Sequence, residues 1–380
     1  MAQIHGICDS RFDEVRALLQ QHIESGEELG ASITVNIDGQ NVVDIWGGYA
    51  DEARTQPWES DTIVNVFSST KTVASFALLM LIDRGLVDVD GKISQYWPEF
   101  AVNGKENIEI RHLLSHSTGL GGWDEKFHMD VLCDHEQIAA KLAQQAPWWE
   151  PGTASAYHAL TFGVLVGEIV QRVTGKPLKR FVAEEISGPL DADFQIGALE
   201  KDWPRISDIV PAEGVDEILR SLPQGSMIAR IMDNPAIHPN FFNSAAARSA
   251  DMGSINGHGN SRSLARILSA ISLGGEVDGT RLLSQKTIDK IFEEQINGED
   301  LFFASHLRWG TGFALSDSGF LSWLPAGKMA TWGGWGGSLA IMDVERRVTF
   351  TYVMNKMAPE VYGSGRGISY VTATFNALGA

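Results

Sequence analysis

A serine and a lysine three residues apart form the first candidate pair of reacting groups. Ser68 and Lys71 bound the sequence Ser-Ser-Thr-Lys, the only S-x-x-K in the chain. The apolar run 63–67 precedes them and an apolar helical pattern follows, so we expect both on one face of a buried helix's first turn. A neighbouring base can activate a serine hydroxyl, and a lysine serves if burial lowers its pKa. The pattern alone also fits a helix-capping serine beside a structural lysine.

Two further segments could complete a catalytic site. Tyr157 ends the turn-like stretch Pro-Gly-Thr-Ala-Ser-Ala-Tyr, just before a long apolar pattern. A phenol beside an ammonium could act as base toward the serine or as acid toward a leaving group, although a core tyrosine at a helix start is the commoner case. The stretch 332–338, Trp-Gly-Gly-Trp-Gly-Gly-Ser, allows close backbone approach, and one of its N–H groups could stabilise an oxyanion. A plain glycine-rich turn is the alternative.

The composition narrows the function classes. The chain has 380 residues and a formal net charge of −18, which disfavours binding to nucleic acid or an anionic membrane. Its length predicts two lobes, since single cores stop growing near roughly 250–300 residues. With two cysteines, no apolar leader and no membrane-length apolar run, the sequence predicts a cytoplasmic protein with a small-molecule partner. The oligomeric state stays open.

The two ends of the chain carry the strand signals. A helix with Phe12, Leu19 and Ile23 on one face, starting at a Ser10 cap, precedes a hairpin over 32–37 and 42–46. Strands over 338–343 and 348–354 and a helix over 368–378 close the chain. We therefore expect a mostly antiparallel sheet flanked by the terminal helices.

The middle of the chain reads as helical. Helices are predicted over 72–84, 110–114 and 160–173, and only loops and short helices over 196–260. The interpretation is an α+β protein: an α/β lobe from residues 1–69 and 266–380, an all-helical lobe from 70–265, and an active site in the cleft between them.

Taken together, these motifs resemble the family VIII carboxylesterases. That family is similar to class C β-lactamases and penicillin-binding DD-peptidases of the serine β-lactamase-like superfamily. The matching motifs are Ser68-x-x-Lys71, Pro-Gly-Thr-x-x-x-Tyr157 and the turn over 112–120, and the resemblance covers most of the chain. It implies a β-lactamase/transpeptidase-like fold, an acyl-enzyme on Ser68, proton transfer by Lys71 and Tyr157, and oxyanion binding by the N–H groups of Ser68 and Trp335. It implies no cofactor, and short-chain acyl esters as substrates.

Two departures from the lactamase pattern bear on the substrate. Trp332, Gly333 and Gly334 stand where the lactamases have Lys-Thr-Gly, and Ala159 stands where they have asparagine. A tryptophan cannot pair with a substrate carboxylate, so neutral esters are favoured, with substrate contacts from the segment 332–335. A β-lactamase, a DD-peptidase, an acyltransferase and an inactive binding protein of the same fold remain alternatives.

A metal site is the remaining possibility that the sequence raises. His112 and His116 stand four residues apart, but H-L-L-S-H lacks the glutamate of a zinc protease. We therefore expect no metal.

Overall fold

The fold is built on one large antiparallel sheet, seen in a computed structural model that describes residues 3–379. Nine strands lie in the order β1-β3-β2-β15-β14-β13-β12-β11-β10, so β15 from the end of the chain pairs with β2 from its start. The bounds are β1 His5–Cys8, β2 Gly30–Ile37, β3 Gln40–Gly48, β10 Ile296–Asp300, β11 Ser305–Trp309, β12 Ala314–Leu315, β13 Met329–Gly333, β14 Leu339–Asp343 and β15 Val348–Met354.

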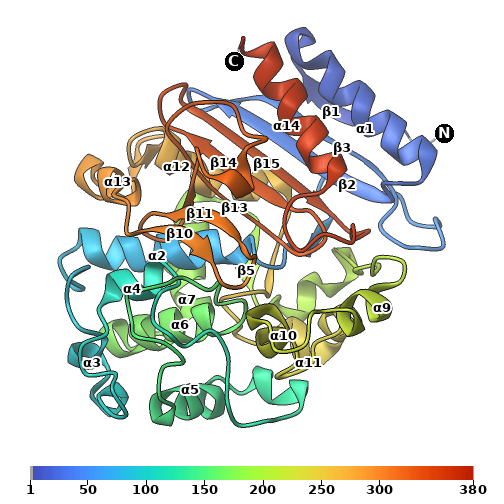
Figure 1. Ribbon diagram of the computed structural model, residues 1–380. Coiled ribbons are helices and arrows are strands. Elements are labelled where there is room, and N and C mark those ends of the chain that lie inside the picture. Colours follow the sequence, from blue (N-terminus) through green and yellow to red (C-terminus); the bar gives the residue numbers. More distant parts are fainter. Residues whose placement is uncertain (1–2, 380) are drawn as a thin grey trace.

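Helices cover both faces of this sheet. The terminal helices α1 (Asp13–Ser25) and α14 (Gly365–Ala377) lie side by side on one face, and α12 (Ser261–Ser272) covers the other (Figure 1). Successive side chains of β2 point to opposite faces of the sheet, so each face can pack against its own helices. Thr34 contacts Ser261 of α12 at 2.8 Å, while Ile33 is buried toward the opposite face.

A buried helix lies at the centre of most of the remaining helices, which pack below the sheet (Figure 1). This is α2 (Thr70–Asp83), whose residues are buried as far as Leu81 and which packs against α6 and α7. The other helices of the described chain are α3 Ile93–Tyr96, α4 Ile110–Leu114, α5 His135–Gln144, α6 Thr161–Thr174, α7 Leu178–Val182, α8 Gly188–Leu190, α9 Val215–Arg220, α10 Met227–Met232, α11 Ala245–Ser249 and α13 Gln285–Ile291. Of these, α9, α10 and α11 form a separate group (Figure 1). Within residues 3–379, no helix combines the length and the apolar character of a membrane span.

A second, smaller sheet underlies the start of α2. It consists of β4 (Ile63–Asn65), β5 (Phe194–Ile196), β6 (Ile206–Ser207) and β7 (Gly257–Gly259), in the order β5-β7-β4-β6. A separate hairpin joins β8 (Glu276–Val277) to β9 (Thr280–Arg281). Because β4 leads directly into the segment before α2, the small sheet fixes where that helix begins.

Most predicted elements are confirmed, and some need correction. The strands β2, β3, β14 and β15, the terminal helices and the helices α2, α4 and α6 lie where the sequence predicts them, whereas the strands β10 to β13 of the same sheet were not predicted. The cap at Ser10 is wrong, because a 3₁₀ turn precedes α1 and the Asp9 carboxylate accepts the Arg11 N–H. Strand β1 was missed. The expectation of loops and short helices alone over 196–260 omits strands of the small sheet, so the middle segment is not entirely helical.

Candidate active site

Ser68 lies in the turn between β4 and α2, after a residue in a rare backbone conformation. Phe67 has φ 46°, which non-glycine residues seldom adopt. Hydrogen bonds hold it there: its N–H donates to the Asn65 side chain at 2.7 Å, and its carbonyl accepts the Thr70 N–H at 2.9 Å. The sharp turn places Ser68, which is 8% exposed, at the head of a buried helix.

The Lys71 amine is buried and has three polar neighbours. Its Nζ lies 2.7 Å from the Ala159 carbonyl, 2.9 Å from the Ser254 carbonyl and 3.2 Å from Ser68 Oγ. Burial lowers the pKa of this amine well below its ordinary value. Carbonyls can only accept hydrogen bonds, so they take both N–H groups of a neutral amine and leave its lone pair directed at the Ser68 hydroxyl.

The Tyr157 phenol completes the group around the serine. Its hydroxyl accepts a hydrogen bond from Trp332 Nε1 at 3.2 Å, and its ring lies 4.7 Å from Lys71 Nζ. Burial raises the pKa of the phenol above its ordinary value, and hydrogen bonds with Ser68 and Trp332 offset part of that rise. A neutral phenol is therefore the resting form, and it can donate a proton.

The backbone around Tyr157 is held by a pair of buried histidines. His116 Nδ1 accepts the His158 N–H at 3.1 Å, and the His116 carbonyl accepts the Ala156 N–H. The His158 ring bridges the Ala156 carbonyl at 2.5 Å and the Thr118 hydroxyl at 2.6 Å. Burial lowers the pKa of His158 to about 4, so this ring is neutral at physiological pH.

The glycine-rich turn between β13 and β14 lies against the backbone before Ser68. Ser338 Oγ donates to the Val66 carbonyl at 2.8 Å and contacts Ser69 Oγ at 2.9 Å. Among the described residues, the N–H groups of Ser68 and Trp335 have no hydrogen-bond acceptor. Unpaired backbone N–H groups are what an oxyanion site requires.

Gly334 makes this close approach possible, and its replacement by alanine should damage both fold and site. An added Cβ would lie 2.3 Å from both the Val66 carbonyl oxygen and Ser338 Oγ. We expect Gly334→Ala to lower the free energy of unfolding by about 1–3 kcal/mol, the usual cost of overpacking, and to lose activity because the turn must shift. Urea unfolding measures the first effect. Gly298→Ala is the matched control, since nothing lies within 4 Å of its added Cβ, and equal unfolding curves for the two variants would contradict the prediction.

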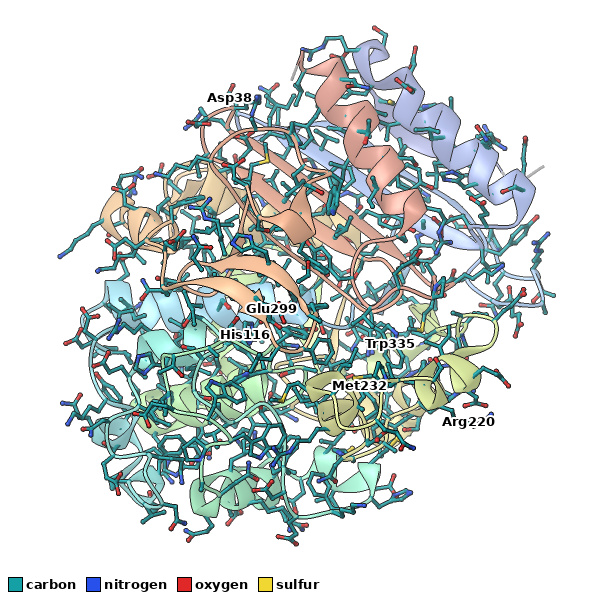
Figure 2. All side chains as sticks on the ribbon, viewed as in Figure 1. Asp38, His116, Arg220, Met232, Glu299 and Trp335 are labelled. Atoms are coloured by element: carbon teal, nitrogen blue, oxygen red, sulfur yellow. The ribbon has the colours of Figure 1, made fainter. Side chains whose placement is uncertain are left out.

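The structure brings the predicted site residues together. Ser68, Lys71, Tyr157 and Trp332 are linked by the contacts above, and the Trp335 ring packs 5.9 Å from that of Phe67. Both labelled residues His116 and Trp335 lie along the boundary between the sheet and the helices (Figure 2). Gly333 is the last residue of β13 and Gly334 is the first residue of the β13–β14 connection, so these glycines follow the end of a strand rather than mark the start of one.

Sequence reasoning missed three features that shape the surroundings of Ser68, Lys71 and Tyr157. The carbonyls of Ala159 and Ser254 carry no side-chain signal, so no motif could have pointed to them as partners of Lys71. The strained Phe67 looks like any apolar strand residue, and only its flanking Asn65 and Thr70 hint at a turn. Asp300, whose carboxylate accepts the Tyr157 N–H at 3.2 Å, lies in a stretch that reads as a polar loop.

The two histidines considered as metal ligands have separate roles. His112 Nδ1 accepts the Glu109 N–H at 3.2 Å within the first turn of α4, whereas His116 packs against Tyr157. Across residues 3–379, no three histidine, cysteine, aspartate or glutamate side chains converge in a way that could hold a metal ion.

Comparisons with known proteins find similarity to β-lactamase-like proteins. The beta-lactamase family model matches residues 15–370. The esterase/beta-lactamase LipL of Mycobacterium tuberculosis is 33% identical over 367 residues, which cover 93% of this chain and 83% of that protein.

Solved structures resemble the fold over almost its whole length. A crystal structure of a family VIII carboxylesterase superposes with a TM-score of 0.91 at 35% identity, covering 99% of this chain and 100% of that one. A penicillin-binding protein homolog from Caulobacter crescentus gives a TM-score of 0.90 at 33% identity, with the same coverage.

Proposed function

The chain belongs to the beta-lactamase family, and from this premise we propose that it is a serine carboxylesterase with Ser68 as its nucleophile. The observation that carries the proposal is the geometry at Lys71. Two backbone carbonyls occupy two directions around the amine, and Ser68 Oγ at 3.2 Å occupies a third. Esterases are among the similar proteins, including LipL and the family VIII carboxylesterase.

The first half of the reaction forms an acyl-enzyme. Ser68 Oγ attacks the ester carbonyl carbon as its proton passes to the neutral Lys71 amine, and the carbonyl electron pair moves onto oxygen. The oxyanion lies against the N–H groups of Ser68 and Trp335. The bond to the alcohol oxygen then breaks. Tyr157 gives its proton to that oxygen, and the Lys71 ammonium beside the phenol ring returns a proton to Tyr157.

The second half releases the acid. Water replaces the departed alcohol, gives a proton to the Lys71–Tyr157 pair and attacks the acyl carbon through its oxygen. The bond to Ser68 Oγ breaks, and the serine oxygen takes that proton from the Lys71–Tyr157 pair. One ester and one water thus yield one acid and one alcohol, and the enzyme returns to its initial protonation state.

The preferred substrates are neutral short-chain acyl esters. Trp332 occupies the strand position at which the lactamases have a lysine that pairs with a substrate carboxylate. Its indole N–H instead donates a hydrogen bond to the Tyr157 hydroxyl at 3.2 Å. Penicillin-like substrates carry such a carboxylate and find no cation at this position.

The proposal is tested with esters and a covalent probe. Purified protein should hydrolyse p-nitrophenyl acetate and butyrate faster than a long-chain ester, and faster than it opens a chromogenic cephalosporin. A serine-directed phosphonate should add one adduct by intact mass, located by peptide mapping on the peptide that contains Ser68. An adduct on another residue would contradict the assignment of the nucleophile. Cephalosporin hydrolysis at rates that rival the esters would contradict the substrate class.

A further inference from the structure

Asp300 is a buried carboxylate on the edge strand β10 that contacts Tyr157, and the reaction steps proposed above do not use it. It ends this strand and has no exposed surface. We propose that Asp300 is a positioning residue that holds the Tyr157 phenol where it protonates the leaving alcohol. This inference rests on the proposed function and adds a residue to it.

The carboxylate binds the backbone of Tyr157 directly. Asp300 Oδ1 accepts the Tyr157 N–H at 3.2 Å, and the neighbouring Leu301 N–H donates to the Ser155 carbonyl at 2.8 Å. Two hydrogen bonds therefore join the loop carrying the tyrosine to the end of β10. Since His116 fixes the same loop at Ala156 and His158, Tyr157 is held from both sides.

The same carboxylate fixes three aromatic rings that surround the phenol. Its Oδ1 accepts the N–H groups of Phe302 and Phe303 at 3.0 and 3.3 Å, and its Oδ2 accepts Trp309 Nε1 at 3.2 Å. The ring centroids of these residues lie 5.3, 5.5 and 6.4 Å from that of Tyr157, with Trp309 parallel to within 4°. Figure 2 labels Glu299, the neighbour of Asp300, at the boundary between the sheet and the helices.

The bonding pattern requires an acceptor at Asp300. Each of these four partners is an N–H donor. Burial raises the pKa of the Asp300 carboxyl and these hydrogen bonds oppose that rise. The two carboxylate oxygens can accept all four bonds, whereas an asparagine would turn an NH₂ group toward one of the donors. A buried donor without a partner costs free energy, and the backbone or the ring would move to recover a bond. Such a movement displaces the phenol without altering any group that touches the substrate.

A displaced acid has a specific kinetic signature. An alkoxide leaves only when it is protonated, whereas p-nitrophenolate is a stable anion that leaves without help. A misplaced Tyr157 should therefore impair alkyl esters much more than p-nitrophenyl esters that share the same acyl group. General destabilisation of the fold would impair both equally.

The experiment compares Asp300→Asn with wild type on ethyl butyrate and p-nitrophenyl butyrate, using kcat/KM because it reports acylation. We expect kcat/KM for ethyl butyrate to fall about 10²-fold, the lower end of a general acid's contribution, and that for p-nitrophenyl butyrate to fall less than about fivefold. Equal losses on the two esters, or no loss in a folded variant, would overturn the proposal.

Three further variants make the result decisive. Asp343→Asn is the matched control: Asp343 is also fully buried and accepts backbone N–H groups from Glu345 and Arg346, but at the far end of β14. Any loss of kcat/KM in Asp343→Asn should be the same for the two esters. If Asp300→Asn does not fold, Trp309→Phe takes its place, because it removes a single N–H donor to Asp300. This variant should also lower kcat/KM for ethyl butyrate more than kcat/KM for p-nitrophenyl butyrate. Equal losses on the two esters in this variant would overturn the proposal. Tyr157→Phe removes the acid altogether and so sets the largest difference between the two esters that can be expected. If this variant loses kcat/KM equally on both esters, the role assigned to Tyr157 itself is overturned.

Discussion

Ser68→Ala should lower kcat for p-nitrophenyl butyrate by at least about 10⁴-fold while the protein stays folded. Removing the nucleophile of a serine hydrolase typically costs up to about 10⁶-fold, because no other group can form the acyl-enzyme. The fold should tolerate the change, since the hydroxyl lies in a turn whose shape depends on Asn65, Phe67 and Thr70. Steady-state rates, a thermal melt and intact mass after phosphonate treatment together measure the outcome.

A serine on the same helix provides the control for that experiment. Ser75 is fully buried in α2, one helical turn after Lys71, and its hydroxyl donates to the Gly312 carbonyl at 2.9 Å rather than to Lys71 or Tyr157. Ser75→Ala should lose some stability and keep its activity and its phosphonate adduct. A Ser68→Ala protein that retains turnover or still gains the adduct would show that another residue is the nucleophile.

The parts of the fold that the sequence predicts are those specified by neighbouring residues. The hairpin of β2 and β3 is predicted from the strand-like alternation of residues on either side of Asp38-Gly39. Both turn residues have positive φ, as is favoured in two-residue hairpin turns. Helix α6 ends at Thr174 and is capped by Gly175, whose φ of 72° only glycine adopts readily. Ser68 and Lys71 are three residues apart, so a helix alone brings them together.

The unpredicted parts depend on contacts between distant residues. Asp300 meets Tyr157 only because β10 is the last strand of the sheet, and 143 residues separate the two. Strand β7 is Gly257–Gly259, too short and too rich in glycine to show strand propensity, and it forms because β4 and β5 flank it. Phe67 has a positive φ because the chain turns sharply there from β4 into α2, and a phenylalanine gives no sequence signal for such a conformation.

Lys71→Met should lower kcat/KM for esters by about 10⁴-fold, the upper range of a general base's contribution. Methionine preserves much of the apolar packing and removes the amine that faces Ser68 Oγ. Lys71→Arg should be equally inactive at every pH tested, because a guanidinium cannot become a base in a protein. Activity in either variant within tenfold of wild type would show that Tyr157, rather than Lys71, takes the serine proton.

A second buried lysine distinguishes loss of the base from loss of a buried amine. Lys105 has no exposed surface, and its Nζ donates to the carbonyls of Val102 at 2.8 Å and Gln145 at 2.5 Å, as Lys71 donates to two carbonyls. Burial also lowers its pKa, to about 8. Lys105→Met should reduce the free energy of unfolding by about 1–3 kcal/mol through the lost hydrogen bonds and leave kcat/KM unchanged.

The pH dependence of the wild type gives an independent test of the same base. Only the neutral amine accepts the serine proton, so kcat/KM should rise with pH through the pKa of Lys71 and then level off. Because burial lowers that pKa well below its ordinary value, the plateau should begin well below the pH at which a free lysine deprotonates. Lys105→Met should keep this profile and Lys71→Met should lose it. A profile that survives in Lys71→Met would assign the titration to another group.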